Sequence, residues 1–341
     1  MKVAVIFGGS SEERDVSIAS GMEVMTGLKA AGHAVIAVDT AKGVLTSEDE
    51  RSLAGFEVMK KPPESQALVQ AHGQSPIAMV NAVELNNVDV VFITLHGGSG
   101  EDGTFQALLE ESNIPFTGSG HVGSAIAMDK DVSKRLMVAA GVPTPAWQMC
   151  IPGVKKSTEN KLGFPVVVKP NAQGSTIGLT LVHDPVALPS AIDKAAQFDD
   201  EIMLEMYIDG REFTVGILDG HALSVGEIVA PSDIFDYESK YQCGGAQEIF
   251  PADIPAAKTQ EIKELGVQVH RILKLGGYSR VDFRMDGDGY LWCLEANSVP
   301  GLTPTSLLPQ SAKTAGIEFS ELCERICLLG IKRSWSGKKD R

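Results

Sequence analysis

The chain is poor in basic residues for its size. Its 341 residues include 30 Lys and Arg against 44 Asp and Glu, which gives a net charge of -14. This excess of negative charge argues against a nucleic acid or an anionic membrane as a partner, because both carry negative charge themselves. A phosphate-binding site in such a protein must therefore be a local cluster of basic groups.

Cysteine is scarce too, with five residues, and their number is odd. None of them has the paired spacing of a metal site, as expected for reduced thiols in a cytosol. Cys323 and Cys327 lie one helical turn apart and form either a buried helix face or part of a metal site. The buried face is favoured because no histidine lies nearby in the sequence.

Long apolar runs are also missing. Residues 3–7 are apolar, but this run is shorter than the core of a secretory signal, and no other segment approaches the length of a membrane span. We therefore expect a cytoplasmic protein without a membrane partner. The sequence contains no internal repeat, and its length allows two or three domains.

The N-terminal part of the sequence has the pattern of strand-loop-helix units. Residues 3–7 have the continuous apolar pattern of a strand buried in a parallel sheet, and a helix is predicted from about Glu12. Further strands are predicted at residues 35–38 and 88–95. The first unit lacks G-x-G-x-x-G, so a dinucleotide site is not supported. We expect an open parallel α/β sheet with a ligand crevice at its strand ends.

Two polar residues follow these strands. Glu13 has capping-box spacing to Ser10, so it either ties down the start of its own helix or faces a ligand in the crevice. His96 opens a glycine-rich loop after the third strand. It is either a ligand contact or hydrogen-bonded scaffolding, and its position in a loop favours the ligand contact.

A second candidate site lies in the middle of the chain. A helix is predicted over residues 122–140, which include Lys130, and a strand over residues 162–170 delivers Lys169 to its end. The loop at residues 171–178 consists of small residues and follows that lysine. It suits a phosphate group, and a plain hairpin turn is the alternative. It is not a Walker A loop, because the lysine precedes the glycines.

Near the C-terminus, polar and apolar residues alternate over residues 280–285, and residues 286–289 have turn composition. This pattern predicts an antiparallel hairpin. With a turn of four residues, the cross-strand pairs include Asp282 with Cys293 and Arg280 with Glu295.

In that register Asp282 and Glu295 are diagonal neighbours on one face of the hairpin, with Asn297 beyond them. Oxygen ligands without histidine or cysteine favour Mg²⁺ over zinc or copper. The alternative is an ordinary solvated face.

Between the two candidate sites, residues 231–250 are predicted to form a long loop, because they have no clear hydrophobic period. This loop is either a lid or a surface insertion.

Eight short motifs, in this order, resemble those of the D-alanine:D-alanine ligases of the ATP-grasp superfamily, over residues 3–329. Each motif is weak evidence alone, but their order is specific. They are Glu13-Arg-Asp-Val-Ser17, the loop from His96 to Gly103, Met128-Asp-Lys130, Val167-Val-Lys-Pro170, Gly174-Ser-Thr-Ile-Gly178, Glu212-Phe-Thr-Val215, Lys240-Tyr241, and Glu295-Ala-Asn297 with Pro300-Gly301.

The resemblance implies an α/β fold: an N-terminal open parallel α/β domain for the substrate, then an ATP-grasp fold made of two α+β subdomains. The boundaries we expect are residues 1–118, 119–205 and 206–341, with the lid at residues 231–250 in the last part. It also implies a homodimer that joins two D-alanine molecules with ATP through an acyl phosphate, for peptidoglycan precursor synthesis. The departures from the family pattern, such as Tyr207 in place of a common tryptophan, remove no side chain that does chemistry.

For ATP, the resemblance implies two lysines on the phosphates, a strand end along the adenine and a carboxylate on the ribose. These residues are Lys130 and Lys169, then Glu205, Met206 and Ile208, then Glu212. It also implies two Mg²⁺ ions, which Mn²⁺ can replace, bound by Asp282, Glu295 and Asn297.

For the amino acids, the resemblance implies that Glu13 takes the first ammonium group, in a set with Ser175 and Tyr241, and that His96 lies beside the same substrate. Arg280 and the Gly301 N–H would face the developing oxyanion. Ser306 and Leu307 would receive the second carboxylate. Alternatives are a D-alanine:D-lactate ligase, which the pair Lys240 and Tyr241 disfavours, another carboxylate-amine ligase, and a silent nucleotide-binding regulator.

Overall fold

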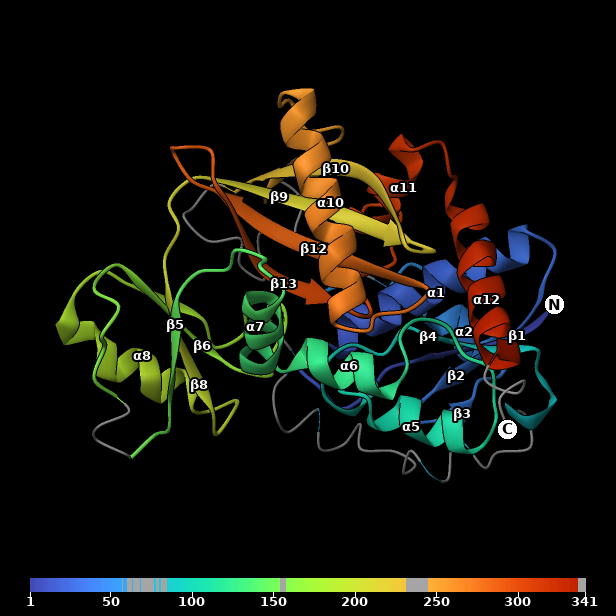
Figure 1. Ribbon diagram of the computed structural model, residues 1–341. Helices are drawn as coiled ribbons and strands as arrows, with labels where there is room; N and C mark the ends of the chain where they lie inside the picture. The colour runs from blue at the N-terminus through green and yellow to red at the C-terminus, as the bar shows by residue number, and fades with distance from the viewer. Residues whose placement is uncertain are drawn as a thin grey trace.

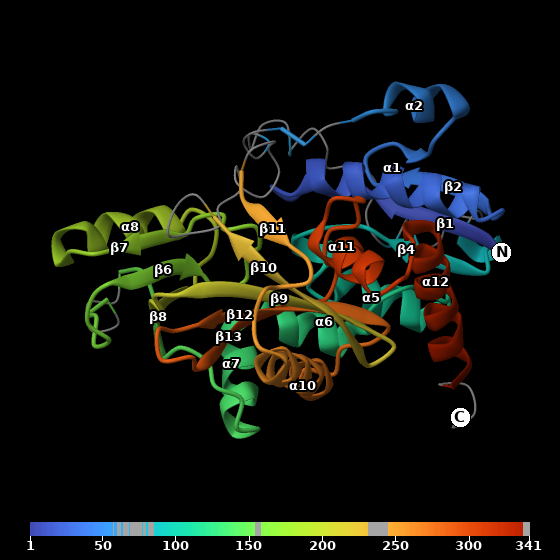
Figure 2. The same ribbon diagram turned by 90° about the horizontal axis from the view of Figure 1, so that it is seen from above.

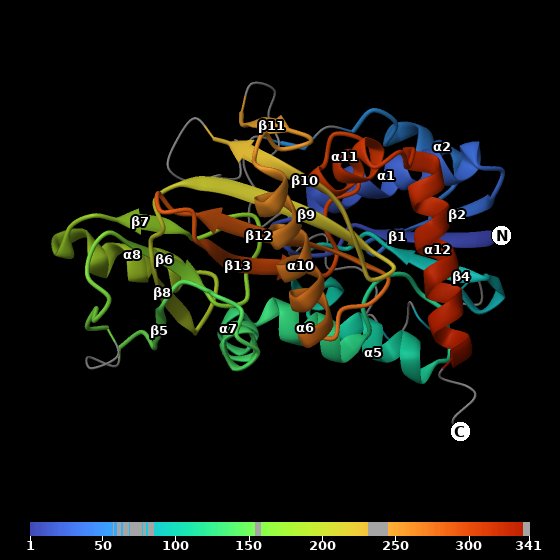
Figure 3. The same ribbon diagram turned by 45° about the horizontal axis from the view of Figure 1, so that its top comes forward.

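The computed structural model describes residues 1–56, 58–59, 85–153, 158–230 and 245–336, together with the single residues 63, 68, 77 and 80. Three sheets succeed one another across the molecule, each with its own helices, and the first strand and the last described helix both lie at the first sheet (Figures 1 and 3). None of the helices in these described parts is long and apolar enough to cross a membrane.

The first sheet has the order β3-β2-β1-β4, in which β1 is parallel to β2 and β4, and β3 is an antiparallel edge. The apolar run in β1 is completely buried because both faces of the strand are covered. The predicted parallel sheet is confirmed. Its elements are β1 (Lys2–Phe7), α1 (Arg14–Ala30), β2 (Ala34–Asp39), β3 (Gly43–Val44), α2 (Ser47–Ser52), β4 (Val90–Ile93) and α5 (Thr104–Glu111).

One predicted helix is in fact two. Residues 122–140 form α6 (His121–Met128) and α7 (Lys130–Ala139), which Asp129 separates. Asp129 has extended backbone angles, and its carboxylate accepts a hydrogen bond from the Val132 N–H at 3.0 Å. This is the geometry of an N-cap, which an aspartate favours over a helix interior. The break puts Lys130 at the first position of a new helix.

The second sheet has the order β5-β8-β6-β7 and is antiparallel throughout. The loop that follows Lys169 joins the neighbouring strands β6 and β7, so it is a hairpin connection as well as a candidate phosphate loop. The elements are β5 (Trp147–Cys150), β6 (Val166–Pro170), β7 (Thr180–Val182), a short 3₁₀ helix (Pro185–Ala187), α8 (Leu188–Ala195) and β8 (Ile202–Met206).

The third sheet is antiparallel, with the order β11-β10-β9-β12-β13. Helix α10 covers one face and α11 the other (Figure 2): a side chain at Gly266 of α10 would meet Val215, while a side chain at Gly216 would meet Leu308 of α11. The elements are β9 (Arg211–Leu218), β10 (His221–Val229), β11 (Gln247–Ile249), α10 (Ala256–Ile272), β12 (Tyr278–Met285), β13 (Leu291–Asn297) and α11 (Leu307–Thr314).

Only the end of the predicted lid at residues 231–250 lies within the described part of the chain. Its last residues form the edge strand β11, so the prediction of an irregular loop is wrong there. Residues 231–244, and with them Lys240 and Tyr241, lie outside the described residues.

The hairpin register also differs from the prediction. The turn has five residues, because the Asp286 carboxylate accepts a hydrogen bond from the Tyr290 N–H at 2.9 Å, and a β-bulge follows between Asp282 and Phe283. The predicted pairs of Asp282 with Cys293 and of Arg280 with Glu295 are therefore wrong. The observed pairs are Arg280 with Asn297, Asp282 with Glu295 and Phe283 with Cys293.

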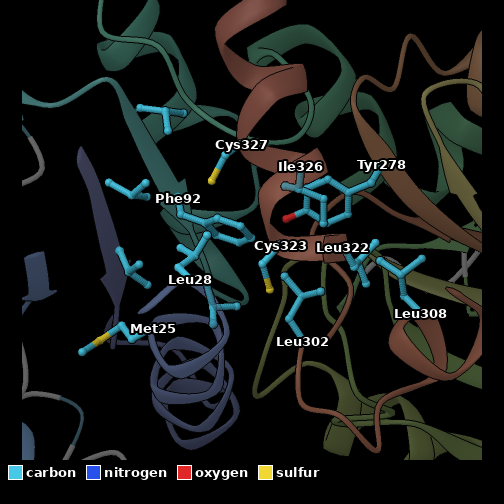
Figure 4. Close-up of a cluster of buried hydrophobic side chains, with 14 of the residues drawn as sticks. Met25, Leu28, Phe92, Tyr278, Leu302, Leu308, Leu322, Cys323, Ile326 and Cys327 are labelled. Atoms are coloured by element: carbon cyan, nitrogen blue, oxygen red, sulfur yellow. The ribbon is translucent and has the colours of Figure 1, made fainter. Parts of the chain in front are cut away.

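The last helix, α12 (Phe319–Ser336), returns to the first sheet and packs against α1 and β4. Its Leu322, Cys323 and Ile326 enter one apolar cluster with Leu28 of α1 and Phe92 of β4 (Figure 4). Cys323 and Cys327 are both completely buried, which confirms the predicted apolar helix face. The C-terminal segment thus completes the core of the N-terminal sheet.

We predict that Leu322→Ala lowers the free energy of unfolding by about 2–5 kcal/mol, because it opens a cavity in a closely packed core. Leu322 has no exposed surface, whereas Leu328 on the same helix is 51% exposed and gives the matched control. Urea unfolding followed by circular dichroism measures both variants. Equal effects of Leu322→Ala and Leu328→Ala would contradict the packing role of α12.

Candidate active site

Two hollows meet beside the third sheet. The first lies between the second and third sheets, and the second is bordered by the third sheet and the strand ends of the first. Every described residue that the sequence predicted for a site lines one of the two. The residues that line both are Lys130, Gln173, Gly174, Ser175, Arg280, Glu295 and Leu307.

A buried ion cluster forms the wall of the first hollow. Glu205 on β8 lies between two lysines: Lys169 Nζ is 2.7 Å from its Oε2, and Lys134 Nζ is 2.8 Å from its Oε1. Burial acts to raise the pKa of Glu205, but the two adjacent ammonium groups outweigh it and hold that pKa below its ordinary value. Glu205 is therefore an anion, and Lys169 is held at the edge of the hollow.

The far end of this hollow is organised by Arg284. Its Nη1 donates to the Tyr207 hydroxyl at 3.1 Å and to the Ile208 carbonyl at 3.0 Å, and its Nη2 donates to Glu212 at 3.2 Å. The guanidinium also lies over the Tyr207 ring, 5.2 Å from its centroid. Arg284, for which no role was predicted from the sequence, holds both the segment after β8 and the Glu212 carboxylate.

Lys130 connects three elements at the junction of the hollows. At the start of α7, its Nζ donates to the Gln173 carbonyl in the small-residue loop at 2.6 Å and lies 3.6 Å from Glu295 on β13. A cation placed there faces both cavities.

The bulged hairpin brings Asp282 and Glu295 together as direct cross-strand partners. Asp282 is surrounded by donors: Arg280 Nη2 at 2.9 Å, the Thr214 hydroxyl at 2.7 Å and the Asn297 amide at 3.0 Å. Because Asn297 donates through Nδ2, its carbonyl oxygen points away from Asp282. The two carboxylates and this amide oxygen are hard ligands, so the residues fit a divalent cation such as Mg²⁺.

Glu13 joins the first sheet to the small-residue loop. The Ser175 hydroxyl donates to Glu13 Oε1, across the boundary between the two parts of the chain. A Cβ at Gly174 would lie 2.8 Å from Glu13 Oε2, so a larger residue there would displace the Glu13 carboxylate. The capping-box alternative is wrong: α1 begins at Arg14, and the Glu13 side chain makes no cap hydrogen bond.

His96 is buried on the floor of the second hollow, with Nε2 3.4 Å from the Ser20 hydroxyl. Burial and the charge of Arg280 lower the pKa of His96 to about 4, so the ring is neutral at physiological pH. It therefore offers a hydrogen bond rather than a positive charge.

Glu101 is a site residue that the sequence reasoning did not single out, although it lies in the loop that His96 opens. It accepts hydrogen bonds from the Gly97 N–H at 3.1 Å and the Val299 N–H at 3.4 Å. Burial and the nearby Glu13 carboxylate raise the pKa of Glu101 to about 7. An acidic residue in a glycine-rich loop is not by itself a clear sequence signal, and only the fold reveals that Glu13 is its neighbour.

The loop after β13 closes the second hollow. The Leu302 N–H donates to Ser20 at 3.2 Å, and the Thr303 N–H donates to the Ser306 hydroxyl at 3.1 Å. Ser306 is the N-cap residue of α11, so the positive end of that helix is directed at the cavity that Ser306 and Leu307 line. A Cβ at Gly301 would lie 3.1 Å from the Ser306 hydroxyl, which keeps this turn tight.

Two antiparallel sheets that hold a lysine-lined cleft between them, behind an open parallel domain, define an ATP-grasp protein. Models of the N-terminus and the C-terminus of D-ala D-ala ligase match residues 2–119 and 136–328. The chain therefore belongs to the D-alanine–D-alanine ligase family.

Individual relatives agree with this assignment. The chain is 40% identical to the D-alanine–D-alanine ligase of Citrifermentans bemidjiense, over 95% of this chain and 94% of that one. It is 39% identical to the ligase of Bordetella petrii, over 95% and 90% of the two chains. The crystal structure of the Bacillus anthracis D-alanine–D-alanine ligase complexed with ATP matches 99% of both chains, with a TM-score of 0.76 and 29% identity.

The raised pKa of Glu101 gives a testable dependence of stability on pH. The folded protein keeps this proton up to about pH 7, whereas an unfolded glutamate loses it near pH 4.5. The folded state therefore binds more protons between these values, and the contribution of Glu101 to stability is lost as the pH rises through 7. We predict that the free energy of unfolding of the Glu101→Gln protein, relative to that of the unsubstituted protein, is about 2 kcal/mol higher at about pH 8 than at about pH 5.

Urea unfolding at both pH values measures this difference. Glu111→Gln, which changes an exposed carboxylate on α5, is the control and should show no such gain. A constant difference between Glu101→Gln and the unsubstituted protein across this range would show that Glu101 does not hold its proton in the folded state.

Proposed function

We propose that the protein joins two D-alanine molecules into D-alanyl-D-alanine, with ATP as co-substrate and ADP and phosphate as the other products, for peptidoglycan precursor synthesis. The observation that supports this best is the junction of the two hollows. There Lys130, Ser175 and Arg280 face both a cleft suited to a nucleotide and a cavity suited to amino acids. The names of its relatives point to the same reaction.

In this proposal ATP occupies the first hollow. Lys130 and Lys169 contact its phosphates, because ammonium groups offset the charge that gathers there during transfer. Glu205, Met206 and Ile208 border the adenine, and Glu212 accepts hydrogen bonds from the ribose. All six line this hollow.

Asp282, Glu295 and Asn297 would hold two Mg²⁺ ions, or Mn²⁺ in their place, beside the phosphates. Among the described residues no group of three or more His, Cys, Asp or Glu side chains is arranged as a metal site. The proposed set has two carboxylates and one amide, and phosphate oxygens complete the coordination in sites of this kind. The bound cation supplies charge neutralisation at the transferring phosphoryl group.

The first D-alanine would bind with its ammonium group at Glu13, whose carboxylate is already oriented by Ser175. The neutral His96 and the half-buried Glu101 lie on the same floor of the cavity. Lys240 and Tyr241 would approach this substrate from the segment that follows β10.

The reaction begins with the carboxylate of the first D-alanine. It has no leaving group of its own, so one of its oxygens attacks the γ-phosphorus of ATP, and ADP departs with the electron pair of the broken P–O bond. The resulting acyl phosphate is attacked by the free amine of the second D-alanine. Arg280 and the Gly301 N–H stabilise the tetrahedral oxyanion until phosphate leaves.

The second D-alanine would place its carboxylate at Ser306 and Leu307. These residues begin α11, and a helix N-terminus favours an anion through its dipole and its N–H groups. This arrangement directs the amine of the second substrate towards the acyl carbon.

The domain division that we propose is residues 1–118 for the first substrate, 119–205 and 206–341 for the two ATP-grasp subdomains. We further propose a homodimer that acts in the cytoplasm, a compartment that keeps thiols reduced. The four described cysteines are buried.

The proposed reaction can be tested directly. Incubation with ATP, Mg²⁺ and D-alanine should release phosphate and give a product with the mass of the dipeptide, while L-alanine should give neither. D-alanine with D-lactate should also give the dipeptide. A depsipeptide mass would shift the assignment to a D-alanine:D-lactate ligase, and no phosphate release with D-alanine would reject the proposal.

Arg280→Ala tests the oxyanion role. We predict a loss of about 10²–10³ in kcat with a much smaller change in the KM for ATP, because the arginine acts on charge that develops in the transition state. Steady-state phosphate release at saturating substrates measures both constants. Arg325→Ala on the exposed face of α12 is the control. Turnover close to that of the unsubstituted protein would remove Arg280 from the mechanism.

A further inference from the structure

One buried charge in the structure has no part in the proposed reaction. Lys134 on α7 has no exposed surface, and its ammonium group lies behind Glu205, away from the first hollow. Burying a lysine is costly unless its charge is paired and hydrogen-bonded. A lysine at this place therefore calls for a physical reason beyond packing.

Oxygen atoms from three residues surround the ammonium group. Lys134 Nζ lies 2.8 Å from Glu205 Oε1, donates to the Thr144 hydroxyl at 2.5 Å, and donates to the Pro145 carbonyl at 3.0 Å. The Trp147 ring covers the group from another side, 5.1 Å from ring centroid to nitrogen. These contacts fix the ammonium group, so Lys134 cannot reach a ligand in the cleft.

The same contacts place Lys134 at the joint between the second and third sheets. Thr144 and Pro145 lead into β5, and the neighbouring Pro143 carbonyl accepts a hydrogen bond from the Cys293 N–H of β13 at 2.8 Å. Trp147 is the cross-strand partner of Glu205. Lys134 thus contacts Oε1 of the Glu205 carboxylate, and Lys169 contacts Oε2.

We propose that Lys134 is a positioning residue for the nucleotide: it neutralises Glu205, so that Lys169 keeps a net positive charge for phosphate binding. The proposal rests on the proposed function only in placing the ATP phosphates beside Lys169. With an ammonium group at Lys134, the charges of Lys134, Glu205 and Lys169 would sum to one net positive charge. Without it, Glu205 would neutralise Lys169, and the part of the wall beside Lys169 would lose its attraction for an anion.

Lys134→Met keeps most of the side-chain volume and removes the charge. We predict that it raises the KM for ATP about ten- to a hundred-fold, the range expected when one charged hydrogen-bonding interaction is lost. The KM for D-alanine should remain close to its original value, and kcat at saturating ATP should change far less than the KM. Arg135→Met is the control, since Arg135 is exposed on the same helix.

Calorimetry separates a charge effect from a general disturbance of the cleft. Lys134→Met should weaken the binding of ADP much more than that of adenosine, because only ADP presents phosphates to Lys169. An equal loss for both ligands would indicate a shape effect and overturn the proposal. These binding measurements need no turnover, so they stand even where phosphate release with D-alanine fails and the proposed reaction is rejected.

The decisive comparison uses Glu205→Gln as a background. If Lys134 acts only through the Glu205 carboxylate, Lys134→Met should change ADP affinity by less than about three-fold in the Glu205→Gln protein. This double variant also leaves no buried carboxylate without its partner, so the test holds even where Lys134→Met alone fails to fold. If Lys134→Met lowers ADP affinity in the Glu205→Gln background by the ten- to hundred-fold predicted for the single variant, the proposal is overturned. An unchanged KM for ATP in a folded Lys134→Met protein would overturn it as well.

Discussion

Charge buried in the cleft is the constraint on which the rest of this structure depends. A charged group removed from water must have a partner, or folding becomes unfavourable. Two of these partnerships join different parts of the chain: Lys130 of α7 faces Glu295 of β13, and Ser175, in the loop between β6 and β7, donates to Glu13. These two contacts therefore align the three parts of the molecule at the same place where substrates would meet.

The fold itself followed largely from local patterns. The continuous apolar run at residues 3–7 predicted a buried parallel strand, and alternation with turn residues predicted the hairpin of β12 and β13, because these signals depend on short-range periodicity. The positions of the candidate site residues followed from ordered motifs, and every described one lines a hollow.

Other features depend on contacts that a local pattern does not contain. The bulge at Asp282 shifts the register by one residue, and the break at Asp129 depends on a cap that competes with helix propensity. Lys134 and Glu101 gave no clear signal in the sequence. Their significance comes from Glu205 and Glu13, which are distant in sequence and adjacent only after folding.

The return of α12 to the first sheet has a consequence for how the protein is made. The cluster that joins α1 and β4 to Leu322 and Ile326 needs residues that are synthesised long after α1. At translation rates of about 5–20 residues per second, α12 is synthesised roughly 15–60 s after α1. During that interval the apolar surface of α1 and β4 lacks the helix that covers it in the folded protein, so the N-terminal part of the chain cannot complete its core while it is being synthesised.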